Sequence, residues 1–478
     1  MSHRDQRCRI GSRTNAQDLI AAVDGLLAEG DQSGIVFRKD CGWTVRGLVT
    51  AALVWAWSSR TTLKGRFGQA RQIACGVGSG CAPAATSYQA FLKLLVRWTI
   101  PLRKQLVAAF QALMERDFCR QFRWAGYVVL AADGSKVKLA RTRSNENWSA
   151  AKTRGRKGKQ RRKADRARHR PRSDQARRQQ AHDKKADSPQ MALMLLHHVW
   201  LRLPWDWQLG SSAVGDRERL CSLIPQLPID ALVVADAGFF GYEFWSELLS
   251  SGRHFVLRAG GTVRLLKKLG VVRESRGIIC LWPDSAAKRG CAPLVLRLVV
   301  VHDGRQPWYL VTNVLDPQQL SDRQVAEIYR RRWRIEVFFR HFKQTFGRAK
   351  LRSHKAEHAA CEAQWSLLGL WAMLLHAQRE QQPEDGTPGQ LSVARVLKAF
   401  SHAIDESRSR PEPNTSLAAQ IRTAVVDQYR RRNKHSRNHP RKKYKLSAKP
   451  PHITNATHWQ RQLAKQMMAR SSEKGLTA

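Results

Sequence analysis

Four segments within the first 120 residues carry apolar side chains at intervals of three and four positions. These intervals predict amphipathic helices over residues 16–28, 45–57, 86–96 and 102–118. Glycine and proline interrupt the pattern at residues 76–83, which predicts a loop there. We therefore expect residues 1–120 to form a helical N-terminal region.

The pattern changes to short apolar runs after residue 121. Such runs predict buried strands over residues 127–132, 191–200, 205–214 and 231–235. Further β-rich runs fill residues 253–315, and helical spacing returns over 322–346, 356–381 and 391–403. This order predicts an α/β fold in which helices flank a mixed sheet. The sheet domain spans residues 121–350 and contains a β-rich insertion over 253–315.

Two segments are too basic to bury a core. Residues 152–185 hold 16 lysines and arginines against 3 acidic residues, so we expect a basic insertion over 141–190. It is either an arm that contacts a polyanion or a solvated insertion that binds nothing. Residues 430–449 hold 10 basic residues and no acidic one. We expect C-terminal helices over 351–425 and a disordered tail over 426–478.

The whole chain carries a formal net charge of +45, from 83 basic and 38 acidic residues. Nucleic acid is the usual partner of so basic a protein, and a membrane surface is the alternative. The longest apolar stretches, residues 48–57 and 365–377, are too short to cross a bilayer. Nine scattered cysteines without a Cys-x-x-Cys pair argue against a zinc site and favour a reducing compartment. We expect a cytoplasmic, nucleoid-associated protein.

The predicted helix over 322–346, with Asp322 as its cap, gathers polar residues beside an apolar face. At about 100° per residue, Tyr329, Arg332 and Lys343 fall within about 40° of Glu336. A carboxylate, two cations and a hydroxyl are the groups that a phosphoryl-transfer site needs. The alternative is a solvated ion pair between Glu336 and a neighbouring arginine.

Two aspartates accompany predicted buried strands. Asp133 follows the run at 127–132, and Asp236 follows the run at 231–235. Asp303 is a rival for the second position, although Asp303-Gly304 is also typical of a hairpin turn. Each aspartate alone could be a simple turn residue.

The spacing Tyr329-x2-Arg332-x3-Glu336-x6-Lys343 resembles the YREK signature of bacterial insertion-sequence transposases of family four. That family belongs to the ribonuclease H-like DDE class, and the resemblance spans about residues 127–343. It implies a ribonuclease H-like sheet with two aspartates on buried strands and a β insertion before the glutamate. We therefore expect Asp133, Asp236 and Glu336 to be the catalytic and metal-binding residues.

The resemblance also implies a mechanism and partners. Two Mg²⁺ ions, which Mn²⁺ can replace, would support cleavage and strand transfer of DNA at terminal inverted repeats. Arg332 and Lys343 would contact DNA phosphates, and Tyr329 would bind a phosphate near the cut. The N-terminal helices loosely resemble the family's end-recognition region. A homodimer is expected in the DNA complex.

Members of the family often cut DNA through a hairpin intermediate, in which an aromatic residue of the β insertion stacks on a flipped base. Trp308 is the first candidate for this role and Trp282 the second. The alternative is that Trp308 packs in the core of the insertion. His197 and His198 could suggest a metal pair, but neighbouring residues of a strand point to opposite faces.

Two other functions remain consistent with the sequence. One is a catalytically silent DNA-binding descendant of a transposase. The other is a nuclease of the same fold that cleaves DNA without strand transfer.

Overall fold

The computed structural model describes residues 13–27, 35–38, 41–76, 87–149, 188–270, 277–302, 307–381, 391–426 and 449–475. The basic segment 152–185, Asp303 and nearly all of 430–449 lie outside the described residues. No helix within these described ranges is long and apolar enough to cross a membrane.

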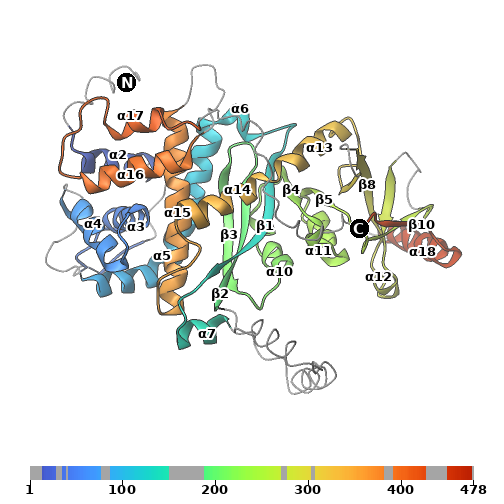
Figure 1. The fold of residues 1–478 in the computed structure, drawn as a ribbon. Helices are drawn as coiled ribbons and strands as arrows, with labels where there is room; N and C mark the ends of the chain where they lie inside the picture. Colours follow the sequence, from blue (N-terminus) through green and yellow to red (C-terminus); the bar gives the residue numbers. More distant parts are fainter. Residues whose placement is uncertain are drawn as a thin grey trace, which may run out of the picture.

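The helical part of the molecule is built from both ends of the chain (Figure 1). Its N-terminal members are α2 (Asn15–Leu27), α3 (Val45–Trp57), α4 (Leu63–Gly76), α5 (Tyr88–Asp117) and α6 (Cys119–Phe122). The C-terminal members are α15 (Ala356–Glu380), α16 (Val393–Asp405) and α17 (Leu417–Arg422). Helix α15 packs against both α3 and α5, so the N-terminal region is not a separate body.

Two helical expectations need correction. Two of the predicted helices are parts of one helix, α5, which continues through Pro101, and α4 was not expected. A helix that packs on several sides carries apolar residues around its whole circumference, so the spacing of apolar residues no longer marks its ends. Helix α5 is such a case, because it packs against α15, α2 and β3. In addition, Cys75 of α4 is disulfide-bonded.

The first five strands form the core of the sheet in the order β3-β2-β1-β4-β5. They are β1 (Val128–Lys138), β2 (Gln190–His198), β3 (Leu203–Ser211), β4 (Ala231–Ala235) and β5 (His254–Arg258). The first three pair antiparallel, whereas β4 runs parallel to β1, and β5 runs parallel to β4. This mixed arrangement, flanked by helices, is the predicted ribonuclease H-like fold class. Short helices α7 (Arg143–Ser149), α10 (Asp216–Cys221) and α11 (Tyr242–Ser250) accompany these strands.

The β-rich insertion extends this sheet rather than forming a separate one. Beyond β5 follow β9 (Trp308–Thr312), β8 (Leu294–Val301), β7 (Ile278–Leu281), β6 (Arg264–Lys267) and β10 (His452–Asn455). The predicted start of the insertion at residue 253 is wrong, because β5 pairs with β4 as a core strand. A lone apolar run could not show which neighbour the strand would take. β8 and β9 pair antiparallel on either side of the segment that contains Asp303.

The expectation of a disordered tail over 426–478 is wrong for its last part. Strand β10 pairs parallel with β6, and α18 (His458–Gly475) follows it. Ala464 of α18 packs in a small core with Leu266 and Trp282 of the insertion. The tail has too few apolar residues to show a core by itself, and its partners lie about 200 residues away in the chain.

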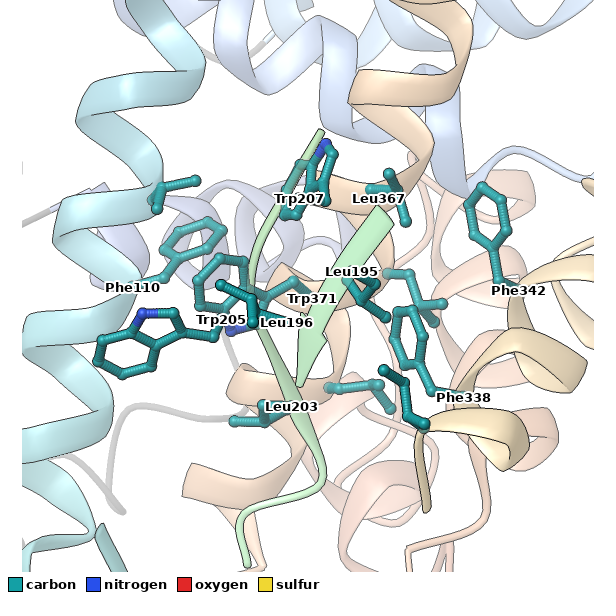
Figure 2. Packing of buried hydrophobic residues seen from close by; sticks show 14 of the residues in the cluster. Phe110, Leu195, Leu196, Leu203, Trp205, Trp207, Phe338, Phe342, Leu367 and Trp371 are labelled. Carbon is teal, nitrogen blue, oxygen red and sulfur yellow. The ribbon is translucent and has the colours of Figure 1, made fainter. Parts of the chain in front are cut away.

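The main hydrophobic core is continuous from the helical part to the sheet. Figure 2 shows Trp207 and Trp371 beside Phe110, while Phe338 lies beside Leu195. The buried Trp207 indole donates to the Gln364 side chain at 2.6 Å, which ties β3 to α15. This continuity braces the sheet edge that carries β3 against the helices.

Candidate active site

The parallel pairing of β1 with β4 brings the two aspartates together. Ala131 is the register partner of Val234, so continuing the register by two residues places Asp133 beside Asp236. Paired residues of neighbouring strands point to the same face, and strands lie about 4.8 Å apart. The carboxylates, 103 residues apart in the chain, are therefore neighbours on one face of the sheet.

The backbone holds both aspartates in place. Asp133 accepts a hydrogen bond from the backbone N–H of Gly134 at 2.9 Å. Asp236 follows the last residue of β4 and caps the short helical turn Ala237–Phe239, accepting from the Gly238 N–H at 2.9 Å. Asp236 thus also serves as the cap of this turn, through one oxygen of its carboxylate.

The predicted single helix over 322–346 is interrupted. Helix α13 (Asp322–Arg331) ends before Arg332, α14 (Arg334–Arg340) follows, and a π-helical turn occupies His341–Thr345. Its N-cap is Ser321 in a capping box with Gln324, not Asp322. The Ser321 hydroxyl accepts a hydrogen bond from the Gln324 backbone N–H, and the Gln324 side chain accepts one from the Ser321 N–H. The spacing of apolar residues could not show the break between α13 and α14.

The four residues of the proposed signature still face one site. Helix α14 packs against β1, and the Arg332 guanidinium donates to the Glu336 carboxylate at 3.1 Å. The same guanidinium lies 5.7 Å from the centre of the Tyr329 ring. Lys343 reaches the far part of β1, where its amine donates to the Ser135 hydroxyl at 2.7 Å.

The charges of the site act on one another. Burial raises the pKa of Asp133 to about 6; Arg332 opposes this rise, while the Asp236 and Glu336 carboxylates add to it. Burial also lowers the pKa of Lys343, an effect that Asp133 opposes. Three carboxylates and two cations therefore share one electrostatic environment, which is the arrangement expected of a site that handles phosphate charge.

The donor chemistry of the site fits a hard divalent cation, but its present arrangement is not closed around one. Carboxylate oxygens are the ligands that Mg²⁺ prefers, and the repulsion acting on Asp133 is what a cation would relieve. Among the residues that the structure describes, however, no three His, Cys, Asp or Glu side chains are grouped closely enough to hold a metal. Glu336 is engaged with Arg332 instead.

Three further residues at the site were not predicted. Ser135 lies two positions after Asp133, so strand alternation places both on one face, and this periodicity could have revealed it. Arg258 ends β5, the next parallel strand, and its side chain is hydrogen-bonded to the Tyr329 hydroxyl. Gly134 takes part through its backbone N–H, which donates to Asp133; a Cβ added there would lie 2.5 Å from the half-exposed Asp216 carboxylate, which would have to move.

The two tryptophan candidates differ in their surroundings. Trp308 is half-buried, and its ring lies 5.8 Å from the Tyr329 ring in an edge-on arrangement. Trp282 is buried in the small core of the insertion and donates to the Cys291 carbonyl at 2.7 Å. The structure therefore places Trp308, and not Trp282, beside a residue of the signature.

The paired histidines are buried parts of β2. His198 contacts the Phe122 carbonyl at 2.9 Å, and the His197 ring lies 5.6 Å from that of Phe338. Burial lowers the pKa of His197 to about 3 and that of His198 to about 4, so both are neutral. They belong to the core and, as neighbours in one strand, to opposite faces of it.

A family model described as a transposase DDE domain matches residues 124–372. This stretch is more than half of the chain and contains all three candidate carboxylates. The chain belongs to the DDE transposase family. The match confirms the class that the resemblance indicated, while the roles of individual residues stay predictions.

Two relatives can be compared with this family member. It is 27% identical over 177 residues to the transposase InsG for insertion sequence element IS4 of Escherichia coli strain K12. That alignment covers 35% of this chain and 38% of the relative, so the chain matches well under half of that protein. A solved piggyBac transposase synaptic complex with hairpin DNA is 9% identical, with a TM-score of 0.37 over 90% of this chain and 87% of that one. This likeness is too low to support an argument.

The raised pKa of Asp133 predicts that Asp133→Asn stabilises the metal-free protein. The wild-type carboxyl has a folded pKa of about 6 against an ordinary 3.8, so wild-type stability falls as pH rises from about 4 to about 6. Asparagine removes this loss. Above pH 6 we expect a gain of about 1–3 kcal/mol in the free energy of unfolding, measured by urea denaturation in a chelator.

The gain should shrink as the pH falls from 6 and vanish near pH 4. Glu412→Gln is the control, because the Glu412 side chain is exposed, and it should change stability little at any pH. A destabilised Asp133→Asn protein at pH 7.5 would contradict the prediction.

Proposed function

We propose that this protein is a DNA transposase that cleaves an insertion sequence at its terminal inverted repeats and joins it to target DNA. The proposal rests on one observation above all: Asp133, Asp236 and Glu336 share an electrostatic site with Arg332. Membership of the DDE family supports it. The reaction class is phosphoryl transfer, first hydrolysis and then attack by a DNA 3′-hydroxyl.

In the proposed reaction, the residues of the chain bind and position phosphate. Arg332 and Lys343 supply positive charge on either side of the carboxylates and would hold phosphate oxygens of the bound strand. Tyr329 is buried, and the Arg258 side chain is hydrogen-bonded to its hydroxyl. For catalysis, Arg332 must leave Glu336 and turn to phosphate, which frees that carboxylate.

Asp133, Asp236 and Glu336 would hold the proposed Mg²⁺ ions. When bound, two such ions activate the attacking hydroxyl and stabilise the leaving oxygen. The carboxylates come from β1, β4 and α14, three elements whose relative positions the core sets. Because Asp133 is partly protonated near pH 6, metal binding would displace its proton and favour neutral pH.

The proposed partners are transposon-end DNA and target DNA. The +45 charge supports a polyanionic partner, and we propose a homodimer within the DNA complex, located at the nucleoid. A silent DNA-binding descendant would bind the same DNA without cutting it. A nuclease of the same fold would cut without joining, and a strand-transfer assay separates these outcomes.

Neutralising each carboxylate should abolish cleavage and spare binding. We expect Asp133→Asn, Asp236→Asn and Glu336→Gln each to lower the Mg²⁺-dependent cleavage rate by about 10³-fold or more, because a metal ligand is lost. DNA affinity, measured by anisotropy without metal, should change less than about threefold, since most of it comes from phosphate contacts elsewhere.

Glu243→Gln is the control, since Glu243 is an exposed residue paired with Arg289 on the surface of α11. It should cleave like the wild type. Substantial cleavage by any of the three carboxylate variants would remove that residue from the proposed catalytic set.

DNA binding should weaken steeply with salt. A protein that makes 6–10 phosphate contacts gives a slope of log K against log salt on the order of −6 or beyond. Deleting residues 152–185 should flatten the slope if this basic segment touches DNA. An unchanged slope would show that the segment makes no contact with DNA.

Trp308→Ala should separate first-strand nicking from hairpin formation. If Trp308 stacks on a flipped base, the variant should nick at a near-normal rate and keep its Tm, but stall before the hairpin, because stacking contributes roughly 1–3 kcal/mol. Gel analysis of each reaction step on a labelled transposon end measures this.

The contrasting variant is Trp282→Ala, whose buried ring supports the insertion core. It should unfold several degrees earlier and lose every step together. If Trp308→Ala behaves in the same way, Trp308 is a packing residue and the stacking role is refuted.

A further inference from the structure

A pocket of about 600 Å³ lies behind the helices that carry the candidate catalytic residues. Its walls come from the α5–α6 connection, the β2–β3 turn, α13 and α14, α15, and the start of α16. At about 100° per residue, Arg334 and Phe338 of α14 point roughly 160° away from Glu336. The pocket therefore lies on the side of α14 opposite Glu336, and its volume is typical of small-molecule sites.

Three arginines crowd one side of this pocket: Arg202, Arg331 and Arg334. Burial lowers the pKa of Arg334 to about 10, with Arg202 and Arg331 adding to the effect. Arg331 forms an ion pair with Glu327 at 2.6 Å, which neutralises its charge. Within the described part of the chain, Arg202 and Arg334 have no carboxylate at ion-pair distance. Neighbouring, partly buried positive charges destabilise the folded protein unless a bound anion neutralises them.

The cluster is held in place without any anion. The Arg334 guanidinium donates to the Val199 carbonyl at 2.7 Å. The Arg331 guanidinium lies 4.8 Å from the centre of the Trp200 ring, which itself stacks on Trp124 at 4.7 Å. Guanidinium groups fixed in this way match phosphate oxygens well, because little side-chain freedom is left to lose.

The rest of the lining mixes apolar side chains with polar ones, among them Asp117, Gln121 and Gln378. Phe338, Val337 and Leu374 supply the apolar wall. His197 also lines the pocket; it is 1% exposed, and its Nδ1 has no hydrogen-bond partner among the described residues. An inorganic anion would bind the arginines but make no contact with these apolar side chains. A phosphate attached to an aromatic ring would contact both.

We propose that this pocket binds a nucleoside phosphate, with the phosphate at Arg202, Arg331 and Arg334 and the nucleoside against Phe338. The ligand could be a free nucleotide or the phosphorylated end of a DNA strand, which present the same chemistry. The proposal does not depend on cleavage activity. Because the pocket and the catalytic face share α13 and α14, a bound ligand would steady the helix pair that positions Glu336.

Calorimetric titration of the full chain tests the proposal, with ADP as one probe and a 5′-phosphorylated trinucleotide as the other. We expect saturable ADP binding at one site, and about tenfold weaker binding of unphosphorylated adenosine. Arg202→Gln and Arg334→Gln should each weaken ADP binding about tenfold or more, because a charge-assisted hydrogen bond is lost. The Arg202 side chain is exposed and has no hydrogen-bond or ion-pair partner among the described residues, so its variant should fold even if Arg334→Gln does not.

The matched control is Arg323→Gln, which removes one exposed positive charge from α13 outside the pocket and should leave binding unchanged. Tighter binding of the trinucleotide than of ADP, lost in Arg202→Gln, would identify a DNA strand end as the source of the phosphate. The reverse preference would identify a free nucleotide. Failure of wild type to bind either probe, or equal weakening by Arg323→Gln and Arg202→Gln, would overturn the proposal.

Discussion

The parallel pairing of β1 with β4 is the constraint on which the candidate site depends. Its register sets Asp133 against Asp236, although the intervening chain contains two strands, two short α-helices and a long basic segment. Hydrogen bonds between strands permit shifts only in steps of two residues without turning buried side chains to the other face. Because both strands are fully buried up to these aspartates, a slipped register would expose apolar residues or bury the carboxylates.

The third carboxylate depends on packing rather than on hydrogen-bond register. Helix α14 presents Ile335 and Phe338 to the sheet and thereby sets the height of Glu336 above β1. The break between α13 and α14 lets Tyr329 and Lys343 reach the same site from different turns. On the reverse side of these helices, the arginine-rich pocket faces the helical part of the molecule. One pair of short helices thus connects two charged sites.

The helical part and the insertion support the sheet from opposite directions. Helices α5 and α15 pack together, and the Trp207–Gln364 contact ties α15 to β3. At the other edge, β10 returns from near the C-terminus to pair with β6. The ten-stranded sheet is therefore held at both ends by segments from distant parts of the chain (Figure 1).

Local patterns in the sequence determined most of the elements and the chemistry of the site. Short apolar runs predicted β1 and β4, and helical spacing predicted the helix region of Glu336, since side-chain periodicity follows directly from backbone geometry. The spacing of Tyr329, Arg332, Glu336 and Lys343 indicated the family before any contact was known. Ser135 could also have been found in this way, because it shares the strand face of Asp133.

Only the tertiary structure decided which strands become neighbours and where helices break. Nothing local in His254–Arg258 shows that β5 pairs with β4, and nothing in His452–Asn455 shows that β10 joins the insertion. The interruption at Arg332 and the gathering of Arg202 with Arg334 likewise arise from packing between segments far apart in sequence. Pairing partners are chosen by the total burial that the whole fold achieves, and that quantity is not contained in any short window of the chain.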